Sequence, residues 1–233
     1  MEAIRFREFR LLWAGQALTG MATWMDQVAR GWLMYELTNS PVQLGLVRGI
    51  QAIPILLFSP FAGTAADRYD RKTQVVIAQV MDMVMYATVA LLIFTGKIQP
   101  WHVYVTAIGM STVQSFQQPS RAAMVADSVP TSHLTNAIGL NSISFNVCRS
   151  IGPALAGMLI AMFGTGSSYA VQAAFYVLAT TATIRIRTAS LSSDDSLRRA
   201  ARKVSFGRSI LEGWKFSWKT ENVRIGLVIT TLA

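Results

Sequence analysis

The sequence has few of the residues that enzyme active sites and disulfide frameworks require. It contains 1 cysteine and 2 histidines among 233 residues, so no disulfide can form within the chain. His102 and His133 do not have the HExxH spacing of a zinc protease, and the chain contains no GxxxxGK[ST] phosphate-binding loop. We therefore expect no metal site, no cofactor and no enzymatic activity.

Charged residues are also scarce. They make up 14% of the chain, whereas a soluble domain holds about 25%. Apolar residues reach 52%, and because a bilayer is crossed by roughly 20 consecutive apolar residues, their runs predict six membrane-spanning helices. None of the runs shows the ten-residue alternation of an outer-membrane β-strand, so the sequence predicts an all-α membrane protein. The six expected spans are residues 11–37, 42–66, 75–94, 101–125, 134–163 and 168–184.

The positive charges follow the pattern of an inner-membrane protein. The net charge is +9, and Lys and Arg gather before the first run, after the second and after the sixth. In the other connections, Lys97 is the only Lys or Arg residue. Because cytoplasmic loops carry the excess of Lys and Arg, we expect the N-terminus and residues 187–222 to be cytoplasmic. A nucleic-acid binder would place its basic residues on one face of a soluble fold, so membrane lipid is an expected partner and nucleic acid is not.

Three regions follow from this pattern. Residues 1–186 would form a six-helix transmembrane bundle. Residues 187–222 would form a cytoplasmic linker with an amphipathic helix, which could lie on the membrane surface or pack on the protein's own helix ends. Residues 223–233 would cover only ~16 Å of a ~30 Å apolar core, and we interpret them as the truncated start of a seventh helix.

The stretch GTAADRYDRK, between the second and third runs, concentrates charge in a short loop. Gly63 would permit close helix approach or a tight turn. Asp67 would accept hydrogen bonds from the free N–H groups that begin the next helix. Arg68, Arg71 and Lys72 would anchor the loop in the cytoplasm. An ordinary positive-inside loop would explain the basic residues but not the Gly63–Asp67 spacing.

Five ionisable residues lie inside the predicted spans: Asp26, Arg30, Arg48, Asp82 and Arg149. Each would cost ~2.5–3.5 kcal/mol if it faced lipid at the bilayer centre, so we expect them to face the bundle interior or an aqueous cavity. Asp26 and Arg30 are neighbours on one helix face. Asp26 could carry the proton of ion coupling, or the two could form a permanent ion pair that holds helices together. Asp82 is the other carboxylate candidate.

A polar face on the fifth run includes Asn146 and Arg149. Their spacing places them on the same side of a helix. This face could line a substrate path, or Arg149 could bind a carboxylate such as Asp26 or Asp82.

Two motifs resemble signatures of the major facilitator superfamily. GTAADRYDRK is similar to the family's motif between helices two and three, with Asp70 where the family usually has glycine. IGPALAG, with Gly152, Pro153 and Gly157, is similar to the antiporter signature of the family's exporters, with Ala156 in place of a glycine. Small residues would allow close helix contact, and Pro153 would bend the helix.

Further stretches, such as QQPSRAAMVADSVP and SFGRSILEGWKFSWKTENVR, resemble the macrolide- and enterobactin-exporter-like branch. The resemblance implies a twelve-helix transporter of the bacterial inner membrane, of which this chain supplies the N-terminal six-helix bundle and central loop and lacks the C-terminal half. It also implies efflux of a drug or siderophore-like small molecule by alternating access, driven by proton exchange. Asp67 and the basic residues beside it would form a latch across cytoplasmic helix ends, with Arg121 as a partner. An uptake permease of the same fold and a truncated, non-transporting fragment are the alternatives.

Overall fold

The structure is a computed structural model that describes residues 2–186, and within these residues all regular structure is helical. The predicted linker, amphipathic helix and start of a seventh span lie outside the described residues. Each predicted span corresponds to one long helix, with bounds that agree to about one helical turn, so the all-α prediction is confirmed. The helices are α1 (Arg7–Thr38), α2 (Pro41–Arg68), α3 (Arg71–Phe94), α4 (Pro100–Asp127), α5 (Leu134–Phe163) and α6 (Thr165–Ile184), with short 3₁₀ helices at Ala3–Arg5 and Thr131–His133.

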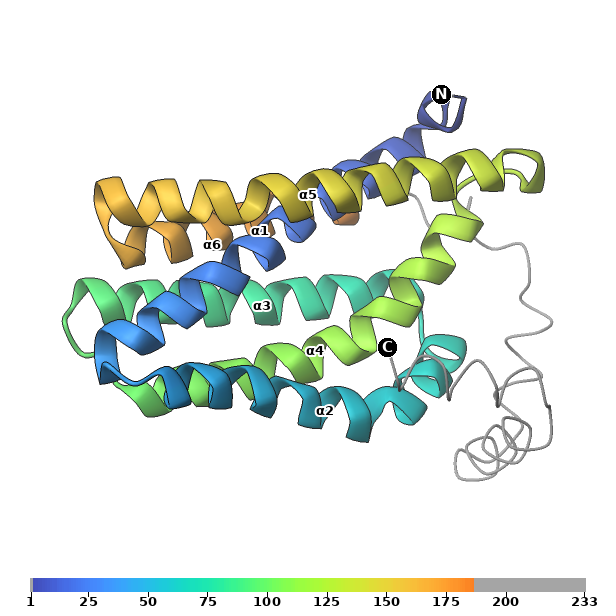
Figure 1. The fold of residues 1–233 in the computed structure, drawn as a ribbon. Helices are drawn as coiled ribbons and strands as arrows, with labels where there is room; N and C mark the ends of the chain where they lie inside the picture. The colour runs from blue at the N-terminus through green and yellow to red at the C-terminus, as the bar shows by residue number, and fades with distance from the viewer. Residues whose placement is uncertain (1, 187–233) are drawn as a thin grey trace.

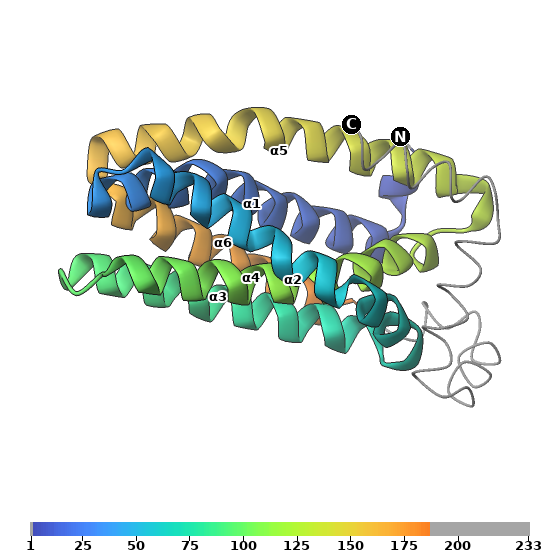
Figure 2. The same ribbon diagram turned by 60° about the horizontal axis from the view of Figure 1, so that its bottom comes forward.

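The six helices run up and down the bundle. The N-terminus and the α2–α3 and α4–α5 connections lie at one end, and the other three connections lie at the opposite end (Figure 1). α2 packs on α4, α1 packs on α5 and α6, and α3 packs on α4 and α6. Figure 2 shows α5 along one side of the bundle and α3 along the opposite side. If α1, α2 and α3 correspond to α4, α5 and α6, the packing of α2 on α4 corresponds to the packing of α5 on α1. Such a correspondence is expected for inverted repeats.

The bundle places polar side chains inside and large apolar side chains outside. Gln16, Thr19, Asp26 and Arg30 on α1 are buried, and so are polar residues of α3, α4 and α6. Exposed large apolar side chains cover α2, the outer face of α3, and α5. In water this arrangement would leave extensive apolar surface exposed, whereas in a bilayer it turns apolar groups toward lipid and shelters polar groups.

Burial explains why the helices differ in hydropathy. Pro41–Ser59, Arg71–Phe94 and Thr131–Phe163 are long and apolar enough to cross a membrane by length and composition. The other three helices contain buried polar residues, for example Arg30 on α1 and Gln172 on α6, which lower their mean hydropathy without facing lipid. We therefore interpret all six helices as membrane-spanning.

Candidate functional site

A buried ion pair lies on α1 inside the bundle, and its arginine is hydrogen-bonded to α4. Arg30 Nε donates to Asp26 Oδ2 at 2.9 Å and Arg30 Nη2 donates to Asp26 Oδ1 at 3.0 Å. Arg30 Nη1 donates to Thr106 Oγ1 at 3.1 Å and to the Val103 carbonyl oxygen at 3.3 Å, both on α4. Arg30 is 0% exposed. Such bidentate, charge-assisted contacts fix both side chains, and the expectation that Asp26 and Arg30 face inward as neighbours is confirmed.

Asp82 lies nearby on α3 in different surroundings. The residue is 4% exposed, and its Oδ1 has no hydrogen-bond partner among residues 2–186. It lines a small cavity of about 50 Å³ together with Asp26, Arg121, Gln114 and Tyr176. Two buried carboxyl groups thus face one cavity, and only one of them has both oxygens bound.

Arg121, which the sequence analysis assigned to the latch, lines the same cavity from α4. Its Nη2 donates to Thr19 Oγ1 at 2.8 Å, and its buried Nε has no hydrogen-bond partner in the described part of the chain. The structure therefore groups Arg121 with Asp26, Arg30 and Asp82. We call these four residues the polar centre.

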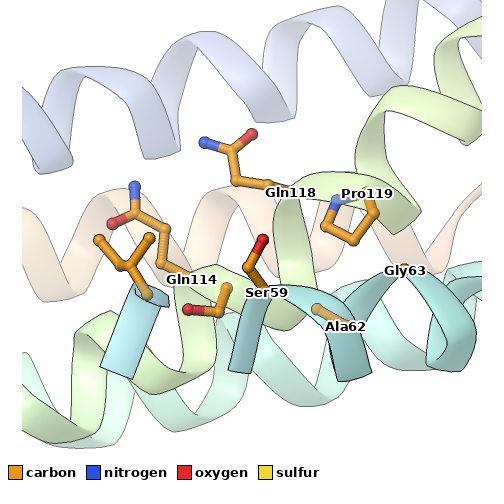
Figure 3. A pocket seen from close by; sticks show the side chains of 8 residues that line it. Ser59, Ala62, Gly63, Gln114, Gln118 and Pro119 are labelled. Carbon is orange, nitrogen blue, oxygen red and sulfur yellow. The ribbon is translucent and has the colours of Figure 1, made fainter. Parts of the chain in front are cut away.

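A larger cavity of about 410 Å³ lies between α2 and α4 (Figure 3). Gln114 lines this cavity and the small one, so the two share a wall. Gln118 and Ser59 offer an uncharged amide and a hydroxyl group to the larger cavity, and such groups can orient a ligand by hydrogen bonding. The lining residues are Ile55, Ser59, Ala62, Gly63, Gln114, Ser115, Gln118 and Pro119.

Gly63 and Asp67 do not have the local roles that the sequence suggested. Gly63 lies inside α2, and a Cβ at this position would meet nothing within 4 Å among the described residues. Within residues 2–186 the glycine therefore lies neither in a tight turn nor in a close helix contact. Asp67 belongs to the last turn of α2 rather than to the start of the next helix. Asp70 is the cap, since its Oδ2 accepts from Thr73 N at 2.7 Å. The residue that departs from the family motif thus caps α3.

The other charges of this loop tie helix ends together. Arg71 Nη1 donates to Asp127 Oδ2, at the end of α4, at 2.5 Å. Lys72 Nζ donates to the carbonyl oxygens of Ile184 and Ile186 at 2.8 and 2.7 Å, which satisfies free acceptors at the end of α6. We call Asp70, Arg71, Lys72 and Asp127 the loop cluster; Arg68 ends α2 beside it. Sequence reasoning missed Asp127, whose only signal is its position at the end of a predicted span.

The polar face of α5 is separate from the buried carboxylates. Asn146 and Arg149 are exposed. Asn146 Nδ2 donates to the Ser142 carbonyl oxygen at 2.8 Å, and the Arg149 guanidinium lies 5.6 Å from the Trp24 ring centroid, a favourable cation–π distance. Arg149 forms no ion pair with a carboxylate among residues 2–186.

The exporter-like motif brings α5 close to α1 at one of its two glycines. A Cβ added at Gly152 would lie 2.7 Å from Trp24 Cβ and 3.2 Å from Met25 N, whereas one at Gly157 would meet nothing within 4 Å in the described structure. Pro153 lies within the helix. Of the two glycines, only Gly152 therefore packs closely among the described residues.

The described site offers hydrogen-bonding and charged groups but no cluster for a metal. Among residues 2–186, no three His, Cys, Asp or Glu side chains gather to hold a metal ion. Side chains of the polar centre can bind a polar ligand, exchange a proton with water, or stabilise an ion.

Comparison with known proteins identifies the family. A sequence profile of the transmembrane secretion effector family matches residues 2–232. The staphyloferrin A transporter of Staphylococcus aureus is 30% identical over 162 residues, which cover 68% of this chain and 40% of that protein. Macrolide efflux protein A of Streptococcus pyogenes is 25% identical over 181 residues, covering 77% and 45%. The multidrug efflux pump Tap of Mycolicibacterium fortuitum is 23% identical over 224 residues, covering 93% and 54%.

The chain thus spans about half the length of the relatives it matches. The family match covers nearly all of the chain. The bundle, with polar side chains inside and large apolar side chains outside, agrees with this match. The predicted resemblance is confirmed: the chain is a multi-pass membrane protein that belongs to the transmembrane secretion effector family of the major facilitator superfamily of transporters.

Proposed function

We propose that this chain forms the N-terminal bundle of a secondary active transporter that exports a small molecule in exchange for protons. The observation that supports this most strongly is the polar centre, which lies inside a bundle with an apolar exterior. The small cavity beside it shares the lining residue Gln114 with the larger cavity. Buried charges are expensive in a membrane and mark ion and substrate pathways. Relatives named for staphyloferrin A, macrolides and multiple drugs support a drug or siderophore-like substrate.

The relatives are about twice as long as their matched regions, which supports a second six-helix bundle in the complete transporter. Alternating access would then come from rocking of the two bundles about a site between them. The distribution of Lys and Arg supports a bacterial inner-membrane orientation in which the N-terminus, the loop cluster and residues 187–222 face the cytoplasm.

In this proposal the segment from Gly63 to Lys72 acts as a cytoplasmic latch. Within the bundle, Arg71 and Lys72 tie the start of α3 to the ends of α4 and α6, so these three helix ends would move as one unit. Gly63, Asp67 and Arg68 would meet the second bundle, since Gly63 leaves open space beside α2. The latch would close when the transporter opens outward and would release when it opens inward.

Drug accumulation in cells tests this function. Cells that express the full-length transporter and control cells are given a radiolabelled macrolide and, separately, labelled staphyloferrin A. We expect lower steady-state accumulation of at least one compound in the expressing cells, and we expect a proton-gradient uncoupler to abolish the difference. Equal accumulation of both compounds would contradict transport of these substrate classes. Higher accumulation would indicate uptake, and a difference that survives the uncoupler would contradict proton exchange.

A further inference from the structure

The two buried carboxyl groups of the polar centre differ in how many contacts a proton would disturb. We propose that Asp82, rather than Asp26, is the group that gains and loses the proton during transport. This inference rests on the proposed function, which it makes more specific by naming the coupling residue.

Asp26 is poorly placed to exchange a proton. Each of its oxygens accepts a hydrogen bond from Arg30, at 2.9 and 3.0 Å. Protonation would occupy one of these oxygens and would leave the buried Arg30 without its counter-charge. Arg30 also donates to Thr106 and Val103 on α4, and these hydrogen bonds together with those to Asp26 hold its guanidinium in place. The geometry therefore favours Asp26 as the fixed partner of a permanent ion pair.

Asp82 can accept a proton without losing a contact at Oδ1. That oxygen has no hydrogen-bond partner among residues 2–186, and Asp82 forms no ion pair within the same residues. A proton on this oxygen adds one O–H bond and breaks no described interaction. When the proton leaves to water, the negative charge remains beside Arg121, which lines the same cavity and can stabilise it.

The titratable groups that line the cavity of Asp82 come from α1, α3, α4 and α6. Arg121 faces it from α4, Tyr176 from α6 and Tyr86 from α3 itself. Asp26 faces the cavity from α1, and its charge is balanced by Arg30. Arg121, which makes one hydrogen bond among the described residues, is thus the positive charge that Asp82 can balance.

A route for the proton exists on the side of the larger cavity. The small cavity of about 50 Å³ is polar and exceeds the ~10–15 Å³ that one water needs. Gln114 separates it from the cavity between α2 and α4. In this proposal the proton passes between water in the larger cavity and Asp82 at the wall that Gln114 forms, and a substrate in the larger cavity would lie next to the same wall.

Reconstituted full-length transporter separates coupling from folding. Uphill transport of a radiolabelled macrolide is driven by an imposed pH gradient, and substrate exchange is measured without a gradient. We expect Asp82→Asn to lose uphill transport, because intramembrane carboxylates mark proton relays, and to retain measurable exchange. We expect Asp26→Asn to lower both together, because it disturbs the α1–α4 contact. Gln79→Met is the matched control, since Gln79 is also buried on α3 with an unpartnered oxygen, and it should keep both activities.

Three results would overturn the proposal: pH-driven transport that persists in Asp82→Asn, selective loss of uphill transport in Asp26→Asn, or the same loss in Gln79→Met. Should Asp82→Asn not accumulate in the membrane, Asp82→Glu keeps the carboxyl group. It should retain uphill transport with a shifted pH midpoint, and an unchanged midpoint would contradict the assignment. If the wild-type protein transports without responding to a pH gradient, proton exchange itself fails, and this result is distinguishable because it needs no variant.

Discussion

The loop cluster and the polar centre contain the same kinds of charged residue in opposite surroundings. In the loop cluster, the Arg71 and Asp127 side chains remain 20% and 17% exposed, and Lys72 donates to the carbonyl oxygens that end α6. In the polar centre, Arg30 is completely buried and Asp82 nearly so. Charges at helix ends remain partly hydrated, so they can tie helices together with a small desolvation cost. Charges in the interior lose their hydration and need a partner to compensate, unless their function requires them there.

This contrast sets the expected sizes of mutational effects. Exposed ion pairs contribute about 0–1 kcal/mol to stability. Removal of one member of a buried pair costs about 3–5 kcal/mol, because the remaining charge is left without compensation. Changes to the buried Asp26–Arg30 pair should therefore affect folding, and changes in the loop cluster should mainly affect movement.

The largest effect is expected for Arg30→Met, which leaves Asp26 buried without its counter-ion. We expect the full-length protein to lose about 3–5 kcal/mol of stability, measured as a fall in its thermal unfolding midpoint in detergent. The double variant Arg30→Met/Asp26→Leu should recover much of the loss, because it removes both charges. An Arg30→Met protein as stable as the wild type would mean that the pair is not structural.

Gly152→Ala should have an intermediate effect. Its Cβ would lie 2.7 Å from Trp24 Cβ and 3.2 Å from Met25 N, and backbone atoms cannot move aside easily. Overpacking of this kind costs about 1–3 kcal/mol, again visible in thermal unfolding. Gly157→Ala, on the same helix with open space beside it, is the matched control and should unfold like the wild type. Equal effects of the two substitutions would show that α1 and α5 are not in close contact.

The smallest effect on stability is expected in the loop cluster. Asp127→Asn should change the unfolding free energy by no more than about 1 kcal/mol. Asp127→Asn and Asp67→Asn should both leave membrane insertion intact. Both should lower transport by the full-length protein, because the latch would be weakened. Exchange of the charges in Arg71→Asp/Asp127→Arg should restore part of the rate. Normal transport by both single variants would contradict the latch.

The sequence predicts those parts of the structure that depend on neighbouring residues. Runs of about 20 apolar residues locate the six helices, and the spacing of four residues places Asp26 beside Arg30. The prediction of the capping residue was wrong by three positions, because α2 continues through Asp67 and α3 begins after Asp70. Helix ends depend on small differences in local hydrogen bonding.

Contacts between distant helices could not be predicted in the same way. Arg121 lines the cavity of Asp82, and Asp127 pairs with Arg71, because α3 packs on α4. No spacing within a single helix contains this information. Gly152 and Gly157 look equivalent in the sequence, and only the approach of α1 separates them.

Proton release on substrate binding tests the central claim most directly. Purified full-length transporter in weakly buffered detergent solution is mixed with a radiolabelled macrolide, and the pH and the bound label are followed together. We predict that binding releases protons from the wild type and from Gln79→Met, and that Asp82→Asn binds the macrolide without release. Binding without release by the wild type, or undiminished release by Asp82→Asn, would contradict exchange of protons for substrate at the polar centre.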